Sequence, residues 1–243
     1  MHLSLLLTGL ALAVDHGPWD QTLSRHATAT RVDYAAIGGE TLDPYLRALA
    51  ESAPPTGRDE QLAFWINAYN ALTVDLVAEN IGGIESIRDL DGGDPWGERS
   101  FTVAGQSVTL NDIEHKILRP MGDPRVHAAV NCASVGCPPL RARAYSAAGI
   151  DAQLDEACRT WVSQNAFVRS GEALQLSKIF EWYGEDFVPA YGSDHFDIPG
   201  VDGEQEAALN FIAAYSDAAT RAWIRAGGYR VGWRDYDWKL NKQ

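Results

Sequence analysis

The sequence predicts an α+β fold, in which a central buried helix packs on a short, mostly antiparallel sheet with further helices around it. Three observations predict it. Residues 58–80 are apolar around much of a helix girth. Short segments at 100–110, 173–176 and 229–233 have the pattern of strands. Other segments have helical periodicity, and no repeat or linker divides the chain. This order of elements is similar to papain-like and transglutaminase-like folds, by analogy of fold alone.

Composition excludes some classes of function. Of the 243 residues 46% are hydrophobic, which suits a sizeable core. The net charge of -13 repels phosphate backbones, so we expect no nucleic-acid partner. The chain has no glycine-rich nucleotide motif, and we expect no cofactor. A small-molecule or peptide substrate is the remaining expectation, and the sequence does not predict an oligomeric state.

Residues 1–13 have the pattern of a signal peptide. They contain an apolar run at 3–12 and end in the small-residue motif Ala11-Leu12-Ala13. A buried N-terminal helix and a mis-assigned start are the alternatives. No other apolar run approaches the ~18 residues of a membrane span. We therefore expect an exported protein, periplasmic or extracellular, with one domain over residues 14–243 in an oxidising compartment.

The first half of that domain is predicted to be mainly helical. A helix over 42–50 has Pro44 in its first turn. The central helix over 58–80 carries Asn67 and Asn70 one turn apart on a buried face. Buried amides need partners, so these two side chains either tie the helix to a neighbouring loop or orient a catalytic group.

A hairpin and a short helix come next. Residues 89–97 form an acidic loop whose spacing does not match a calcium-binding EF-hand. Residues 100–110 are predicted to form a hairpin that turns near Ala104-Gly105. The helix over 111–119 begins with Asn111 as N-cap and Glu114 in a capping box.

Residues 125–140, RVHAAVNCASVGCPPL, concentrate reactive side chains. The apolar residues predict a short buried strand over 126–132, followed by a loop that ends at Pro138-Pro139. In a regular strand His127 and Asn131 share one face, and Cys132 points to the other. A Cys132–His127 pair would then need a bulge, whereas Cys137 in the loop is free of this constraint.

The last third of the chain is predicted to alternate helices and strands. The expected helices cover 151–162, 178–187 after a Ser177 cap, and 205–225. The expected strands cover 173–176 and 229–233. Cys158 lies on the apolar face of the first of these helices, as a small core residue would.

Several ordered motifs are similar to one known family. They are FWINAYNAL (64–72), LNDIEHKILR (110–119), DPRVHAAVNCASVGCPPL (123–140), SKIFEWYGEDF (177–187) and YDWKLN (236–241). Together they resemble the bacterial DUF547 family, a domain of unknown function, from about Val32 to Asn241. Some eukaryotic members are fused to glutaredoxin-like and DEP modules, and the resemblance therefore implies thiol chemistry. The motif residues that match are Asn67, Asn70, Glu114, His115, Arg125, His127, Cys132 and Cys137.

This set of residues contains the parts of a cysteine-dependent hydrolase or acyl transferase. Cys132 or Cys137 would be the nucleophile and His115 or His127 the base. Glu114 or an asparagine would orient that base. A substrate would contact the polar side chains nearby, which are Asn67, Asn70, Arg125, Asn131 and Ser134. Arg125 either binds a substrate carboxylate or pairs with a neighbour such as Asp123.

Three alternatives use the same cysteines. In an exported protein Cys132 and Cys137 can form a structural disulfide, which would make the domain a non-catalytic binding module. They can also work as a redox pair, although their spacing is not that of thioredoxin-like proteins. Zinc is the third alternative, but the spacings of the cysteines and of His115 and His127 match no common zinc pattern, and we predict no metal.

Overall fold

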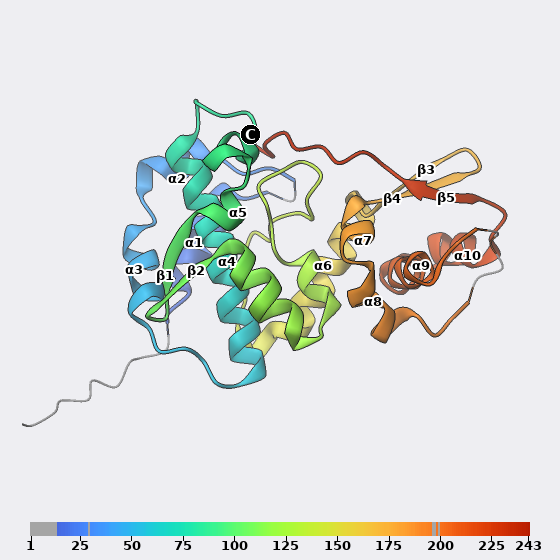
Figure 1. Cartoon of the computed structure of the whole chain (residues 1–243), viewed down its shortest axis with the longest axis horizontal. Helices are drawn as coiled ribbons and strands as arrows, with labels where there is room; N and C mark the ends of the chain where they lie inside the picture. Colours follow the sequence, from blue (N-terminus) through green and yellow to red (C-terminus); the bar gives the residue numbers. More distant parts are fainter. Residues whose placement is uncertain (1–13, 29, 196–197, 199) are drawn as a thin grey trace, which may run out of the picture.

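The structure is a computed structural model that describes residues 14–28, 30–195, 198 and 200–243. The predicted signal peptide, residues 1–13, lies outside the described residues. The fold belongs to the α+β class, as predicted: most of the chain is helical, and two small sheets are present (Figure 1). In the part of the chain that the structure describes, no helix is both long and apolar enough to cross a membrane.

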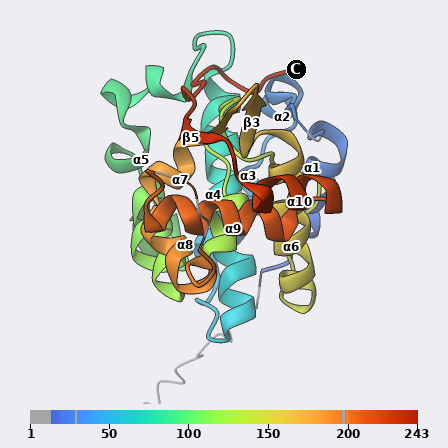
Figure 2. The same ribbon diagram turned by 90° about the vertical axis from the view of Figure 1, so that its right-hand side faces the viewer.

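The molecule has two lobes, each with its own hydrophobic core. The first lobe contains α1 (Gly17–His26), α2 (Tyr34–Glu40), α3 (Asp43–Glu51), α4 (Arg58–Asn80), α5 (Pro95–Glu98), β1 (Ser100–Val103) and β2 (Gln106–Thr109). The second contains β3 (Phe167–Ser170), β4 (Ala173–Leu176), α7 (Lys178–Trp182), α8 (Gly184–Tyr191), α9 (Gly203–Tyr215), α10 (Ala218–Ala226) and β5 (Arg230–Trp233). Figure 2, turned by 90°, presents the second lobe to the viewer.

Helix α4 spans the residues that its apolar pattern predicts, and every side chain from Leu62 to Ala78 except that of Asp75 is buried. Its main partners are α2, α3 and the 3₁₀ and π-helical segments of the first lobe. The prediction that this helix packs on a sheet is therefore wrong in detail. The three-stranded sheet lies in the other lobe, and within the described residues the β1–β2 hairpin is the only sheet of the first lobe (Figure 1).

The hairpin and the short strands are confirmed. β1 and β2 pair antiparallel across a turn in which Ala104 (φ 50°) and Gly105 (φ 69°) both have positive φ. This is the conformation that matches the twist of a two-residue hairpin. In the second lobe β4 pairs antiparallel with β3 and parallel with β5.

Two segments that are each predicted to form a single helix form two helices each in the structure. The segment 178–187 changes direction at Tyr183, between α7 and α8, although Ser177 caps α7 as expected. The segment 205–225 is interrupted at Ser216, and the Asp217 side chain then accepts hydrogen bonds from the amides of Ala219 and Thr220 in the first turn of α10. An N-cap this strong begins a new helix where periodicity alone suggests continuity.

Helix α6 (Ile150–Gln164) joins the lobes. Ile150 and Leu154 belong to the first core, whereas Cys158 and Trp161 belong to the second. Cys158 is fully buried, as predicted for a small core residue.

The predicted strand over 126–132 is wrong. Residues Pro124–Ala128 form a 3₁₀-helix, η5, and the chain beyond it is an irregular loop. The Asp123 side chain accepts a hydrogen bond from the Arg125 amide and caps η5, and the ring of Pro124 fixes φ at its first turn. These two local signals outweigh the apolar run that follows.

The helix over 111–119 is a π-helix, η3 (Asp112–Leu118), followed by the short 3₁₀-helix η4 (Arg119–Met121). The predicted capping box is absent from this helix, because the Asn111 side chain makes no capping hydrogen bond. Thr109 and Asp112 instead exchange two hydrogen bonds, of 3.0 Å each, at the start of the helix. Glu114 is thereby released from capping. The remaining short 3₁₀ segments are η1 (Ile87–Asp89), η2 (Asp91–Gly93) and η6 (Ala147–Gly149).

The last ten residues, 234–243, return from β5 to the first lobe (Figure 1), and we call them the strap. The Leu240 amide donates to the Glu85 carbonyl, and the Asn241 amide donates to the Ala133 carbonyl. The Asn241 carbonyl in turn accepts from the amide of Val32. The strap therefore crosses both lobes and holds the loop that contains the cysteines.

Candidate functional site

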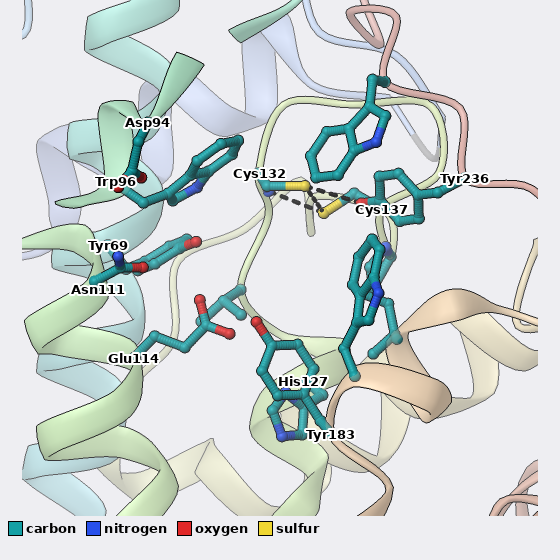
Figure 3. A pocket seen from close by; sticks show the side chains of 15 residues that line it. Tyr69, Asp94, Trp96, Asn111, Glu114, His127, Cys132, Cys137, Tyr183 and Tyr236 are labelled. Carbon is teal, nitrogen blue, oxygen red and sulfur yellow. Dashed lines mark hydrogen bonds between the residues drawn. The ribbon is translucent and has the colours of Figure 1, made fainter. Parts of the chain in front are cut away.

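A cavity of about 260 Å³ lies where the two lobes and the strap meet (Figure 3). Its wall is mostly aromatic, and Cys132 and Cys137 form part of it. The lining residues are Tyr69, Asp94, Trp96, Asn111, Glu114, His127, Val130, Cys132, Cys137, Pro138, Ile179, Trp182, Tyr183, Tyr236 and Trp238. Six segments from distant parts of the sequence thus contribute to one site.

The loop over residues 129–140, here the Cys132 loop, is shaped by buried amides. Asn131 accepts from the Ala133 amide (2.9 Å) and donates to the Pro138 carbonyl (2.7 Å). Ala133 has a φ of 61°, in the left-handed region that disfavours residues with a Cβ. The Asn131 hydrogen bonds offset part of the cost of this turn, which places Cys132 and Cys137 side by side.

The two sulfur atoms are in contact. Cys132 Sγ lies 2.7 Å from Cys137 Sγ, and both residues are free cysteines. This distance exceeds the about 2.05 Å of a disulfide bond, so this structure contains the two cysteines as an unbonded pair. Cys137 is only 5% exposed, whereas Cys132 is half-buried at the cavity wall. A molecule in the cavity therefore meets Cys132 first.

The two thiols differ in acidity. Burial opposes ionisation of Cys132, but hydrogen bonds with Cys137, Ser134 and Tyr236 outweigh it and lower the pKa of its thiol. The hydroxyls of Ser134 and Tyr236 lie 3.1 and 3.0 Å from its sulfur. Burial, together with the neighbouring Cys132, raises the pKa of Cys137 well above its ordinary value. Cys132 is thus the thiol that ionises, and Cys137 the proton donor beside it.

The strap supplies the Tyr236 hydroxyl. The strap is held against the Cys132 loop by two backbone hydrogen bonds. The Val135 amide donates to the Lys239 carbonyl, and the Gly136 amide donates to the Asp237 carbonyl. A Cβ at Gly136 would lie 3.0 Å from the Tyr236 ring and 3.0 Å from the Asp237 nitrogen. Only glycine lets the strap approach this closely without displacement.

His127 lies elsewhere in the cavity wall and has its own partners. It is 2% exposed, and its Nε2 lies 2.7 Å from the Asp186 carboxylate. Its ring stacks on Tyr183 at 4.4 Å between centroids. Burial disfavours ionisation of Asp186, but the hydrogen bonds from His127 and Arg119 prevail and lower its pKa. Among the described residues, no imidazole is hydrogen-bonded to either cavity thiol.

The structure separates the other two residues predicted to work with the cysteines. His115 is exposed and is not part of the cavity lining; its Nδ1 lies 3.1 Å from an Arg119 nitrogen. Glu114, one residue earlier, is 7% exposed and points into the cavity, where the Tyr183 hydroxyl lies beside it (Figure 3). The wide π turn of η3 presents this carboxylate, and π-helical turns are common at functional sites.

The asparagines of α4 hold the backbone of neighbouring loops. Asn70 donates to the Ala129 carbonyl and accepts from the Asn131 amide, both at 2.8 Å. Asn67 does the same with the backbone of Tyr145, at 2.8 and 2.9 Å. Each side-chain amide therefore both donates to and accepts from the backbone of a loop, and Asn70 positions the start of the Cys132 loop.

Arg125 is bound to acids of the protein itself. Its guanidinium contacts the carboxylates of Asp123 (2.7 Å), Asp151 (2.7 Å) and Asp155 (3.0 Å). It does not line the cavity. Of the two roles open to Arg125 in the sequence, pairing with Asp123 is the one that the structure contains. For metals, no group of three or more His, Cys, Asp or Glu in the described part of the chain is arranged to hold an ion.

Sequence reasoning missed several residues of this site. Asp186, the partner of His127, and Tyr236, the partner of Cys132, lie 59 and 104 residues away along the chain. Both lie in motifs that carry the family resemblance, and that was the one signal available. Sequence pattern also does not assign Trp96, Trp182 and Trp238 to the site, because they come from three separate segments.

Comparison with known proteins identifies the central part of the chain. No curated protein and no solved structure matches it. Residues 55–162 match the family model described as "Protein of unknown function, DUF547". This segment runs from the residues before α4 to near the end of α6, and includes Glu114, His127 and the Cys132 loop. Residues 55–162 of the chain thus match the same DUF547 family that the sequence motifs resemble.

Proposed function

We propose that the protein catalyses thiol–disulfide exchange, with Cys132 as the attacking thiol and Cys137 as the resolving thiol. The observation that carries this proposal is the contact between the two sulfurs at the wall of a cavity. The half-buried member of the pair has the lowered pKa, and the buried member has the raised one. An accessible thiolate attacks fastest, and a protected thiol beside it resolves the product.

The reaction proceeds in two balanced steps. The Cys132 thiolate attacks one sulfur of a substrate disulfide, that disulfide breaks, and the first substrate thiolate leaves. Cys137 then attacks Cys132 Sγ, its proton passes to the departed thiolate, and the second substrate thiolate leaves. The substrate gains two electrons, and the protein is left with a Cys132–Cys137 disulfide. A second dithiol restores it, and the reverse sequence oxidises a substrate dithiol.

An aromatic disulfide, 5,5′-dithiobis(2-nitrobenzoate), tests this order of events on the pre-reduced, folded protein. We expect two equivalents of thionitrobenzoate from the wild type, because Cys137 expels the second. Cys137→Ser should release one equivalent and retain the other as a mixed disulfide visible by intact mass. Cys132→Ser should release none in this phase, and Cys158→Ser, the matched control, should behave as the wild type does.

A stable mixed disulfide on the wild-type protein would overturn the proposal, since Cys137 would then not resolve it. So would equal release from wild type and Cys132→Ser.

Hydrolysis or acyl transfer through Cys132 is the second candidate. The observation in its favour is that His127, held by Asp186, lines the same cavity as Cys132. That mechanism needs Cys132 and His127 but not Cys137. Turnover of 4-nitrophenyl acetate that survives in Cys137→Ser and disappears in His127→Gln would favour it over disulfide exchange. Export to an oxidising compartment, predicted from residues 1–13, is part of the proposal.

A further inference from the structure

The cavity beside Cys132 has a continuous aromatic wall. The rings of Trp96 and Trp238 are 5.8 Å apart, those of Trp238 and Tyr236 are 4.5 Å apart, and those of Tyr236 and Trp182 are 4.9 Å apart. Trp182 is 44% exposed, so the arc extends to the protein surface. Tryptophan side chains are mostly buried in protein cores, so a tryptophan exposed at the mouth of a cavity indicates a binding surface.

Opposite this wall lies a buried acid. Glu114 is 7% exposed, and its carboxylate points into the cavity (Figure 3). Its neighbour there is the Tyr183 hydroxyl, and burial together with Glu114 raises the pKa of Tyr183, which keeps that hydroxyl a donor. Among the residues that the structure describes, Glu114 forms no ion pair with Lys, Arg or His. Buried carboxylates are ordinarily paired, so this one lacks its usual partner.

The charge in the cavity around Glu114 is also negative. Asp94 also lines the cavity, and no Lys or Arg is among the described residues that line it. Two arginines that are not among the lining residues lie over rings of the lining. Arg88 lies 5.0 Å from the Trp238 centroid, and Arg119 lies 5.1 Å from that of Tyr183, where it pairs with Asp186 and Glu185. A net charge of -13 adds a field that attracts cations.

We propose that this cavity binds a small organic cation, an ammonium group held between the aromatic arc and Glu114. An aromatic cage with a carboxylate supplies cation–π attraction and an ion pair at once. The volume of about 260 Å³ lies below the roughly 300–1,000 Å³ of drug-sized sites, so the occupant is a small molecule or the end of a side chain. Binding of the cation in this cavity does not depend on the proposed function. Only a reaction of the bound molecule with Cys132 would rest on it.

The test is a titration followed by intrinsic tryptophan fluorescence, because three tryptophans line the site. Choline, its neutral isostere 3,3-dimethyl-1-butanol and the primary amine butylamine are the probes. We expect at least one of the two cations to bind, and the neutral isostere to bind about tenfold more weakly than choline if choline binds. Binding of both cations indicates general ammonium recognition. Binding of one alone identifies a quaternary or a primary group.

Variants assign the interaction. Glu114→Gln keeps the shape of the side chain and should weaken cation binding by about tenfold or more. Trp182→Leu changes an exposed ring of the arc and should weaken it without affecting either core. Trp223→Leu is the matched control, since Trp223 stacks on Tyr229 outside the cavity and should leave binding unchanged. Circular dichroism verifies folding, and Trp182→Leu carries the test if Glu114→Gln does not fold.

Cys132→Ser separates this inference from the proposed function. It should bind the cations as the wild type does, because recognition uses the rings and Glu114. If neither cation binds, or if the neutral isostere binds as tightly as choline, the inference is overturned while the exchange reaction can still stand. If cations bind but Cys132 does not exchange, the proposed function fails and the binding site stands.

Discussion

At the scale of single residues, hydrogen bonding decides the chemistry of Cys132. Burial alone would keep its thiol protonated, as it does for Cys158, whose pKa burial raises. The Tyr236 and Ser134 hydroxyls and the Cys137 thiol surround Cys132 Sγ and reverse that effect. The neighbouring hydrogen-bonding groups thus make Cys132 reactive, whereas burial leaves Cys158 inert.

Tyr236→Phe removes one of these hydroxyls and keeps the ring. A hydrogen bond to a charged group is worth about 1.5–3 kcal/mol, so less of Cys132 is ionised at pH 7 and its alkylation by iodoacetamide should slow by about tenfold. The pH profile of the rate should move to higher pH. Tyr229→Phe, a buried tyrosine that bonds to the Ile224 carbonyl, serves as the control. An unchanged profile in Tyr236→Phe would show that this hydroxyl does not tune the thiol.

At the scale of elements, sequence pattern was sufficient where the determinants are local. The limits of α4 follow from its apolar girth and from the breaks on either side, and β4 follows from its alternation. Pattern failed at residues 124–128 and 112–118. There the side chains of Asp123 and of the Thr109–Asp112 pair select 3₁₀ and π geometry over a strand and an α-helix.

Helix α4 also contains an acid, Asp75, whose ionised form is disfavoured in the folded protein. Burial, and then the charges of Glu79 and Asp43, raise the pKa of Asp75 to about 6. The pKa of Asp75 is therefore higher in the folded protein than in the unfolded chain, where it is about 3.9. Because of this, the contribution of Asp75 to stability is greatest below about pH 3.9 and is lost as the pH rises through about 6. Asp75→Asn should therefore stabilise the protein at pH 8 by about 1 kcal/mol, a value reduced for partial exposure, and give no gain at pH 4.

Urea unfolding at the two pH values measures this difference. Asp59→Asn, an acid on the same helix whose side chain is about half exposed, is the control and should have little effect at either pH. Equal stabilisation of Asp75→Asn at both pH values would contradict the account.

Gly136 tests the contact between the Cys132 loop and the strap. In Gly136→Ala the new methyl group meets the Tyr236 ring and the Asp237 backbone, and the strap must move. Overpacking of this kind costs about 1–3 kcal/mol, and the Tyr236 hydroxyl is withdrawn from Cys132. We expect lower stability and slower alkylation of Cys132 together. Loss of stability with normal alkylation would show that the strap does not position Tyr236.

At the scale of the whole molecule, the site exists because two lobes and the strap meet. Sequence reasoning found Cys132, Cys137, Glu114 and His127, since reactive side chains cluster in short motifs. It could not assemble them, because Asp186, Tyr236 and the tryptophans reach the cavity through contacts between distant segments. Periodicity contains no information about such pairings.

Arg125 tests how the lobes are joined. It links Asp123, which is 9% exposed, to Asp151 and Asp155 on α6, the helix that enters both cores. Arg125→Ala leaves Asp123 buried without its closest partner and should lower the free energy of unfolding by about 3 kcal/mol. Arg125→Lys should recover part of that loss. Because Arg125 does not line the cavity, the folded variant should keep the wild-type exchange rate, and a selective loss of exchange would instead indicate a substrate contact.

The central claim is that Cys132 and Cys137 are a working dithiol. It is tested most directly by equilibrating the protein in glutathione redox buffers, alkylating it with N-ethylmaleimide under denaturing conditions and measuring intact mass. We predict one reversible two-electron transition, from three alkylated cysteines in reducing buffer to Cys158 alone in oxidising buffer. Three alkylated cysteines in every buffer, or a disulfide that no glutathione ratio reduces, would contradict the account.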